Sequence, residues 1–361
     1  MKLLKSILSS ISYFILFLII SSCSNSDDDV IVDKSPAAPQ INLNTVWEKS
    51  KGIETVGIQK IYEYKEKLLA ITIAKGVFIS EDNGITWISS NVGIVDENNV
   101  QLEDIKTYDI SGYGNALYLL TSGNIYLSKD SGSNWEPTNF DTEGFRAGGS
   151  KICAINETTI CASSGSGKFI YNYSSNSGNS WTHKTLSFAN YYHNYKVNNN
   201  NVYTTKGSQG IINSTDNGKN WNSIGLESIR CYDFLFKNDL MITSTEAGIF
   251  KKNSSNEWIE GNVKGLPGIT STRISTLIEI NNWIVALTYD NEIFISKIIE
   301  NKIADWQQLK LDGLEFIDDY MYISALSFSK GKLLIGTTNL HNVGKTSLTH
   351  GKGVYTANIS F

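Results

Sequence analysis

The three arginines of this 361-residue chain, Arg146, Arg230 and Arg273, stand at similar places in the sequence. Each comes 18 to 22 residues before a short run of apolar and β-branched residues, and Lys106 stands 18 residues before another such run. Guanidinium groups carry planar sets of N–H donors that suit carboxylate, sulfate or phosphate. If the fold brings these four side chains to one surface, they predict a site that binds an anionic group of a ligand.

A structural role for the same arginines is also consistent with the sequence, because acidic residues lie close to them in the repeats. These candidate partners are Glu227, Asp233, Glu246 and Asp290. Ion pairs between them and the arginines would join neighbouring elements and leave no free cation. The sequence leaves the two roles open.

The elements that must position these side chains are repeats. The octad S-x-D-x-G-x-x-W occurs four times, with Asn for Asp in the third copy, and each copy follows a β-rich run. Asp and Asn accept hydrogen bonds from nearby backbone amides and Gly adopts positive φ, so each octad predicts a hairpin turn. The defining residues are Ser80, Asp82, Gly84 and Trp87; Ser128, Asp130, Gly132 and Trp135; Ser174, Asn176, Gly178 and Trp181; and Ser214, Asp216, Gly218 and Trp221.

These octads resemble the Asp-box, or BNR, repeats of sialidases, sortilin-type receptors and photosystem II assembly factors. In those families the box joins the third and fourth strands of a β-propeller blade at its outer edge, away from the ligand face. The resemblance therefore implies a fold and no particular activity. Photosystem assembly factors of this repeat class carry a basic patch in a place similar to that of the arginines.

The spacing of the tryptophans predicts seven blades. Seven of the eight, all except Trp283, occupy one repeat position at intervals of 37 to 48 residues, which suits four-stranded blades. The run at 353–358 has no tryptophan after it, and Trp47 has no strand before it, so these two segments would share a blade. We expect an all-β fold: a seven-bladed β-propeller over residues 45–361, closed by its N- and C-terminal strands.

Known propellers indicate where the basic residues would lie. By analogy with them, the first strand of each blade lines the central channel. The start of that strand shares one face with the loop between the second and third strands. This face is the usual ligand face, so Lys106, Arg146, Arg230 and Arg273 are the predicted binding residues, and a protein or glycan with an anionic group is the predicted ligand.

The N-terminal segment has the pattern of an export signal. Lys2 and Lys5 precede an apolar run at 11–20 that is short for a membrane span, and Cys23 follows small residues as in a lipobox. Residues 1–22 thus resemble a lipoprotein signal peptide with Cys23 as the lipidated residue, although an ordinary secretory signal is the alternative. The acidic run after Cys23 resembles an outer-membrane export tag of some Gram-negative bacteria, and residues 23–44 form a tag and flexible tether. We expect a lipid-anchored protein at the cell surface.

Composition argues against several other classes. The net charge of −5 gives no nucleic-acid footprint, and no Cys/His spacing predicts a metal site or a cofactor. His341 and His350 fall in a long polar loop, where solvated side chains are the expected state. Cys153 and Cys161 flank a turn and would face each other across a hairpin, which leaves a disulfide open, while Cys231 is expected to be a buried thiol.

The alternative function is that of a sialidase-like, exo-acting glycoside hydrolase using the same face. Three arginines would resemble the carboxylate-binding triad of sialidases, but residues 145–148 keep only the first two letters of the family's F/Y-R-I-P motif. Glycoside hydrolysis also needs a defined set of acidic residues, and the spacing of the carboxylates singles out none. The sequence therefore predicts a non-catalytic binding propeller, with no catalytic residue assigned.

Overall fold

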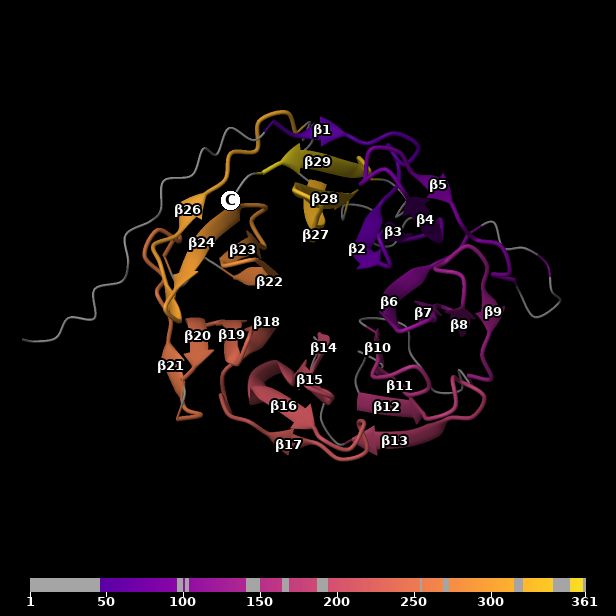
Figure 1. Ribbon diagram of the computed structural model, residues 1–361, viewed down its shortest axis with the longest axis horizontal. Helices are drawn as coiled ribbons and strands as arrows, with labels where there is room; N and C mark the ends of the chain where they lie inside the picture. Colours follow the sequence, from indigo (N-terminus) through magenta and orange to yellow (C-terminus); the bar gives the residue numbers. More distant parts are fainter. Residues whose placement is uncertain are drawn as a thin grey trace, which may run out of the picture. The chain divides into compact units, whose positions relative to one another are not determined.

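The structure is a computed structural model that describes residues 46–95, 100, 104–140, 150–163, 169–186, 194–253, 255–268, 273–314, 321–339 and 351–359. The chain divides into two compact units, Met1–Lys34 and Ser35–Phe361, and every described residue belongs to the second. These residues form seven antiparallel sheets arranged in a ring (Figure 1). The predicted all-β, seven-bladed propeller is confirmed.

Each blade runs from a first strand at the channel to a short fourth strand at the outer edge. Blade 1 contains β2 (Ile58–Tyr64), β3 (Lys67–Thr72), β4 (Val77–Ser80) and β5 (Ile88–Ser89), and blade 2 contains β6 (Thr107–Tyr113), β7 (Ala116–Thr121), β8 (Ile125–Ser128) and β9 (Glu136–Pro137). Blade 3 contains β10 (Lys151–Ala154), β11 (Ile160–Ser163), β12 (Phe169–Ser174) and β13 (Thr182–Leu186), and blade 4 contains β14 (Tyr195–Asn198), β15 (Asn201–Thr205), β16 (Ile211–Ser214) and β17 (Asn222–Ser223), with the short helix η1 (Gly207–Gln209).

Blade 5 contains β18 (Cys231–Lys237), β19 (Leu240–Thr245), β20 (Gly248–Lys252) and β21 (Trp258–Glu260). Blade 6 contains β22 (Ile274–Ile280), β23 (Trp283–Thr288) and β24 (Ile293–Ile299), and both β25 (Lys302–Ile303) and β26 (Gln307–Gln308) pair with β24. Blade 7 contains β27 (Met321–Ser329), β28 (Lys332–Asn339), β29 (Val354–Asn358) and β1 (Glu48–Lys49). In the described part of the chain, no helix is long and apolar enough to cross a membrane.

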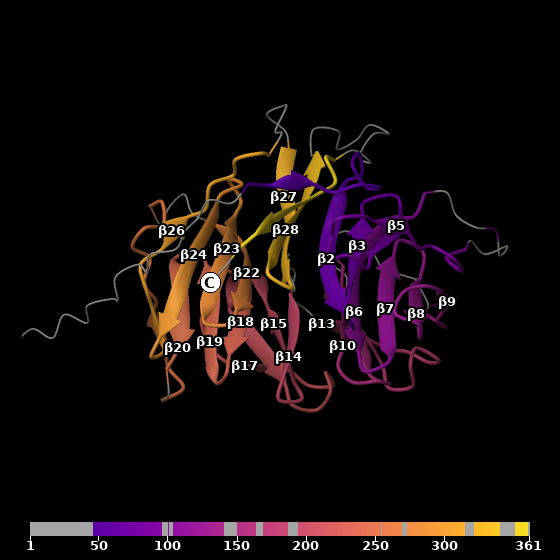
Figure 2. The same cartoon turned by 45° about the horizontal axis from the view of Figure 1, so that its top comes forward.

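The ring closes where β1 pairs with β29, as the sequence predicts. Glu48 lies opposite Thr356 and Lys49 lies opposite Tyr355, and both views place β1 beside β29 (Figures 1 and 2). Trp47 is 2% exposed, and its backbone amide donates a hydrogen bond of 3.0 Å to the carbonyl of Asp312 in the neighbouring blade 6 segment. The N-terminal segment at 47–49 is thus hydrogen-bonded to both blade 6 and blade 7.

The second strands are buried along their whole length because neighbouring blades cover both of their faces. Every residue of β7, β19 and β23 is buried. Strands that are covered on both faces have little need for alternating polar residues, so β7 and β23 are apolar up to a final Thr, while β19 begins with an apolar run and ends in small Thr and Ser residues. These runs supply the packing between blades and hold the first strands in a fixed ring around the channel.

The four octads form the turns between third and fourth strands. In the first, Gly84 donates its amide to Ser80 Oγ at 2.8 Å, and Thr86 donates its amide to Asp82 Oδ1 at 2.8 Å. Asn83 and Gly84 both have positive φ, 61° and 85°, a pair of values that favours Asn-Gly in a tight turn. The same two side-chain contacts recur in the other three copies.

Candidate functional site

Three of the four predicted basic residues stand at equivalent positions on one face. Lys106, Arg230 and Arg273 directly precede the first strands β6, β18 and β22. The backbone carbonyl of each accepts an amide hydrogen bond from the loop after the second strand: from Ser122 to Lys106 at 3.0 Å, from Glu246 to Arg230 at 2.9 Å and from Tyr289 to Arg273 at 2.9 Å. We call this surface, defined by Lys106, Arg230 and Arg273, the basic face.

Arg230 and Arg273 come from the adjacent blades 5 and 6 and meet around two tyrosines. The guanidinium carbon of Arg273 lies 5.9 Å from the ring centre of Tyr289. That ring packs edge-to-face against Tyr232, with 5.8 Å between ring centres, and the charges of Arg273 and Arg230 both act on the Tyr232 hydroxyl. Burial raises the pKa of Tyr232, although the charges of Arg273 and Arg230 act in the opposite direction. We call these four residues the Arg–Tyr cluster.

The cluster presents its cations to solvent without carboxylate partners. Arg230 and Arg273 are both exposed, and neither forms an ion pair with a carboxylate among the described residues. The carboxylates next to Arg230 in sequence have other contacts: Glu227 accepts a hydrogen bond from Ser223, Asp233 pairs with Lys196, and Glu246 accepts the backbone amide of Arg230 at 3.0 Å. The ion pairing that the sequence left open is therefore not formed in the described part of the chain.

Lys106 does not join this cluster. It is exposed on blade 2, which is not a neighbour of blades 5 or 6 in the ring. Arg146, Cys23, His341 and His350 lie outside the described residues.

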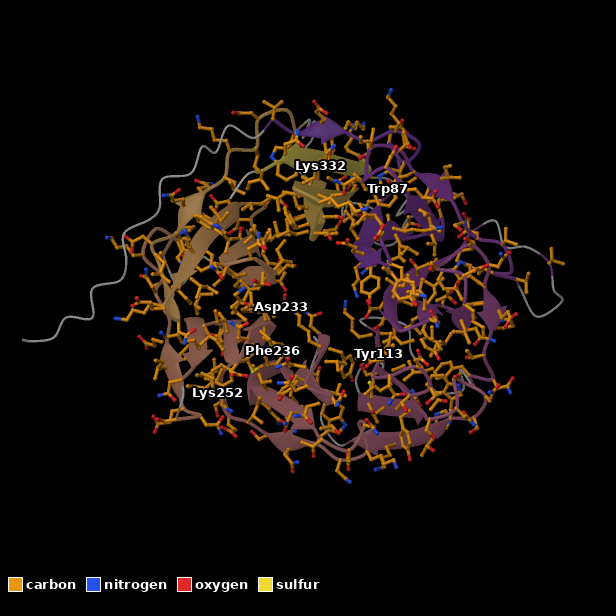
Figure 3. All side chains as sticks on the ribbon, in the orientation of Figure 1. Trp87, Tyr113, Asp233, Phe236, Lys252 and Lys332 are labelled. Atoms are coloured by element: carbon orange, nitrogen blue, oxygen red, sulfur yellow. The ribbon has the colours of Figure 1, made fainter. Side chains whose placement is uncertain are left out.

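The central channel holds a cavity of about 340 Å³ that the first-strand segments of all seven blades line. Asp233 lies at the inner rim of the ring in Figure 3, whereas Trp87 and Lys252 lie farther out. The pairing of the first strands with the second strands shifts by one residue, as in a β-bulge, after the first pair in β2, β6, β18 and β22 and after the third pair in β27. The residues that follow this irregularity line the cavity: Lys60, Asp109, Asp233, Thr276 and Ala325.

An ion pair in the cavity, between a partly exposed lysine and a buried aspartate, links blades 1, 2 and 3. Lys60 Nζ lies 2.6 Å from Asp109 Oδ1, and the Asp109 residue is only 3% exposed. Asp109 also accepts the backbone amides of Ile110 at 2.9 Å and, across the next blade boundary, Ile152 at 3.0 Å. Burial alone would raise the pKa of Asp109, but the charges of Lys60 and Lys151 and the hydrogen bonds outweigh it, so the pKa is lowered and the carboxylate stays ionised.

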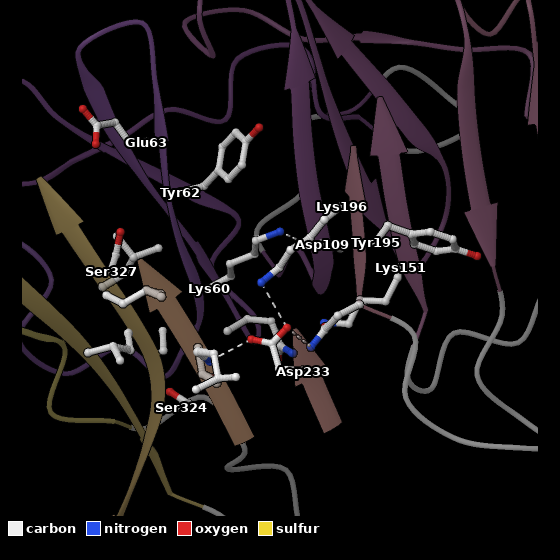
Figure 4. A pocket seen from close by; sticks show the side chains of 18 residues that line it. Lys60, Tyr62, Glu63, Asp109, Lys151, Tyr195, Lys196, Asp233, Ser324 and Ser327 are labelled. Atoms are coloured by element: carbon white, nitrogen blue, oxygen red, sulfur yellow. Dashed lines mark hydrogen bonds and ion pairs between the residues drawn. The ribbon is translucent and has the colours of Figure 1, made fainter. Parts of the chain in front are cut away.

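A second pair repeats this arrangement between blades 4, 5 and 6. Lys196 Nζ lies 3.2 Å from Asp233 Oδ1 (Figure 4). Asp233 accepts the amides of Phe234 and Leu277, each at 2.8 Å. Each aspartate is bonded to the blade before and the blade after its own, so the two aspartates tie six first strands into two groups of three.

Sequence reasoning missed the channel residues, although a signal for them exists. Asp109 and Asp233 each stand three residues after a residue of the basic face, Lys106 and Arg230. A carboxylate at the same offset in two repeats, inside a strand predicted to line a channel, indicates a shared buried role. The sequence predicts Asp233 only as a candidate partner for arginine, whereas its partner in the structure is Lys196.

The described residues include no group of three or more His, Cys, Asp or Glu side chains placed to hold a metal ion. Cys153 lies directly opposite Cys161 in the β10–β11 pairing, as the sequence suggested, and both are buried free thiols. Cys231 is also a buried free thiol.

Comparisons with known proteins identify the fold. No protein-family model matches the sequence, and no curated protein matches it. Among solved structures, YCF48 bound to D1 peptide is similar with a TM-score of 0.61 at 13% identity, over 91% of this chain and 100% of that chain. YCF48 from Cyanidioschyzon merolae has a TM-score of 0.58 at 13% identity, over 87% and 98% of the two chains.

A GH74 xyloglucanase from Xanthomonas campestris has a TM-score of 0.56 at 12% identity, over 86% of this chain and 56% of that chain. The chain thus has the propeller fold of a peptide-bound protein and of an enzyme. At these identities the likeness shows the fold alone.

Proposed function

We propose that this chain is a non-catalytic binding propeller that docks a protein partner through its basic face. The observation that carries the proposal is the Arg–Tyr cluster: two exposed guanidinium groups from adjacent blades, on paired tyrosines and without carboxylate partners among the described residues. Arginine and tyrosine on a rigid framework are the residue types that dominate binding energy in protein interfaces. The ligand group that they suit is a carboxylate.

A protein is a better match than a glycan for this cluster. Tyr289 is 40% exposed beside Arg273, so the surface offers an aromatic side and a charged side together. An acidic peptide can place apolar carbon against the ring and a carboxylate against the guanidinium group. The peptide-bound YCF48 structure shows that this fold accommodates a peptide in that protein.

We do not propose hydrolysis. The two buried carboxylates of the channel, Asp109 and Asp233, are each held by a lysine and backbone amides. These contacts hold both carboxylates in place, and for Asp109 they lower the pKa below its usual value, which favours a structural role over proton donation to a leaving group.

The test is binding of a fluorescein-labelled Glu-rich peptide, with its Gln counterpart as the neutral control, by fluorescence anisotropy. The double substitution Arg230→Gln and Arg273→Gln should weaken binding of the Glu peptide by about tenfold or more, because each charge-assisted hydrogen bond contributes roughly 1.5–3 kcal/mol. A matched variant, Lys129→Gln with Lys184→Gln, removes two exposed charges elsewhere and should bind like the parent. Equal loss in both variants would show that only net charge matters and would defeat the proposal.

We further propose that the octads are Asp-box repeats and that Cys23 is lipidated, which would place the propeller at the outer membrane on a tether. The position of the octads between third and fourth strands supports the first statement. The lipobox-like residues before Cys23 support the second. Replacing Cys23 with Ser should move the protein from the membrane to the soluble fraction, and protease treatment of intact cells should remove only the surface-exposed form.

A further inference from the structure

The channel cavity contains more hydrogen-bond donors than its own acceptors use. A lysine ammonium group has three N–H donors. Lys60 uses two, to Asp109 and to the carbonyl of Ile110, and Lys196 uses two, to Asp233 and to the carbonyl of Phe234. Lys151 also lines the cavity, and its side chain makes no hydrogen bond or ion pair with the described residues, although its charge acts on Asp109.

The acceptors that face these lysines are already engaged. Asp109 accepts from Lys60 and two backbone amides, and Asp233 accepts from Lys196, from Asn194 at 3.3 Å and from two backbone amides. The donors of Lys151 therefore have no carboxylate of their own within the described part of the channel.

The charge balance at this level of the channel is also positive. Three lysines and two aspartates surround one volume in Figure 4, which leaves one positive charge in excess. Glu63 lines the cavity too, but it stands three residues beyond Lys60 on β2, about 10 Å farther along the strand, and Figure 4 shows it apart from the lysines. The excess charge is thus local to Lys151.

We propose that the channel is a binding site for one carboxylate group, which Lys151 holds with the spare N–H donors of Lys60 and Lys196. A single carboxylate would neutralise the one excess charge and supply acceptors to several donors at once. This inference goes beyond the proposed function, because it concerns the channel and not the Arg–Tyr cluster. The carboxylate has two possible sources, a small organic acid from solution or an acidic side chain of a docked protein.

The first arm of the test uses sodium acetate and its neutral analogue acetamide, with the full chain in detergent and binding measured by isothermal titration calorimetry. Acetate should bind and acetamide should not. Lys151→Met keeps the apolar stem but removes the ammonium group, and it should weaken acetate binding by about ten- to a hundredfold. Lys151→Arg should retain most of the binding. The control Lys129→Met, at a side chain 72% exposed, should leave it unchanged.

The second arm distinguishes the two sources. A short peptide with one Glu and its Gln analogue are titrated into the parent, into Lys151→Met and into the Arg230→Gln, Arg273→Gln variant. If the site takes small acids, the peptide binds no more tightly than acetate and the arginine variant matches the parent. If it takes a partner's side chain, the peptide binds more tightly than acetate and both variants weaken it.

The channel proposal is overturned if acetate and the Glu peptide bind Lys151→Met and the parent equally, or if the neutral analogues bind as well as the acids. A melting temperature for each variant shows that the propeller is intact. If the Arg230→Gln, Arg273→Gln variant binds the Glu-rich peptide like the parent while Lys151→Met still weakens acetate binding, the proposed function is wrong and the channel site is supported.

Discussion

The third residue of each octad is an acceptor for backbone amides, and in the octads where this residue is Asp its charge has a measurable consequence. Asp216 Oδ1 accepts the amide of Asn220 at 2.8 Å, while Oδ2 accepts the side-chain amide of Asn220 at 2.7 Å. The backbone hydrogen bond from Asn220 is the main cause that lowers the pKa of Asp216 to about 2. The ionised carboxylate is thus favoured in the folded protein more than in the unfolded chain, where the pKa of Asp is about 3.9.

This difference predicts the pH dependence of stability. A carboxyl with a lowered folded pKa stabilises the protein above its unfolded pKa, and the contribution disappears as the pH falls through its folded pKa. Asp216→Asn should therefore be less stable than the parent at neutral pH, and the difference should shrink between about pH 4 and pH 2. Urea unfolding of both proteins across this range measures it.

The third octad supplies the reciprocal control, because Asn176 already occupies the equivalent place and accepts the amide of Ser180 at 2.9 Å. Asn176→Asp should acquire the pH dependence that Asp216→Asn loses. A stability difference that stays constant with pH in both variants would contradict the assignment.

The thiols should be inert in the folded protein. Burial raises the pKa of Cys231 to about 12, and Cys153 and Cys161 are buried as well. The thiolate is the reactive form, so a chain with Cys23→Ser should react very slowly with iodoacetamide at pH 8 and rapidly in urea. Fast labelling of any of the three under native conditions, read by mass spectrometry, would show an open blade interface.

At the scale of the elements, the first strands are joined by the channel aspartates. Asp109→Ala would leave Lys60 without its carboxylate and the amide of Ile152 without an acceptor. Because the Lys60 side chain is 35% exposed, water can solvate its charge, and the main cost is the unpaired amide of the buried Ile152, roughly 1–3 kcal/mol of unfolding free energy. Chemical denaturation of this variant measures the loss.

The exposed pair between Lys75 and Asp104, at 2.8 Å, offers a matched control. Both of its side chains are in solvent, so Asp104→Ala should leave the free energy of unfolding nearly unchanged. If the two alanine variants lose the same stability, the link between blades is not the source of the effect.

The elements that the sequence predicts well are those with local signals. The octads, the tryptophan spacing and continuous apolar runs such as 67–72 each lie within one repeat, so the blades can be counted from the chain alone. Trp283 departs from the repeat because it begins a second strand and is buried there.

The candidate site is harder to predict because its contacts cross blades. Lys60 and Asp109 are 49 residues apart, and the irregular pairing near the start of the first strands is not marked by glycine or proline in β6 or β18. The equivalence of Arg230 and Arg273 follows from their similar spacing to the third strand of their blades. The contacts of the two tyrosines with them form only when blades 5 and 6 pack together. Spacing locates the position of a residue in the repeat and not its partner.

At the scale of the whole molecule, closure of the ring depends on few residues. Trp47 is buried against blades 6 and 7, and its indole nitrogen donates to the carbonyl of Lys310 at 3.2 Å. Trp47→Ala should lower the free energy of unfolding by roughly 3–5 kcal/mol. The neighbouring Val46, 65% exposed, is the control, and Val46→Ala should have little effect. Intrinsic fluorescence during urea unfolding reports both, and a mild effect of Trp47→Ala would mean that the closure is not needed for stability.

Pairing of β1 with β29 also makes the chain nearly circular. Six blades are each built from consecutive segments of the chain. Only the seventh needs pairing between distant segments, with Glu48 opposite Thr356. Because the two ends of the described chain meet in one sheet, a short linker between them with new ends cut between two other blades should yield a circular permutant with the same ring. Such a permutant would assemble every blade from neighbouring sequence and leave no strand to be recruited from the far end of the polypeptide.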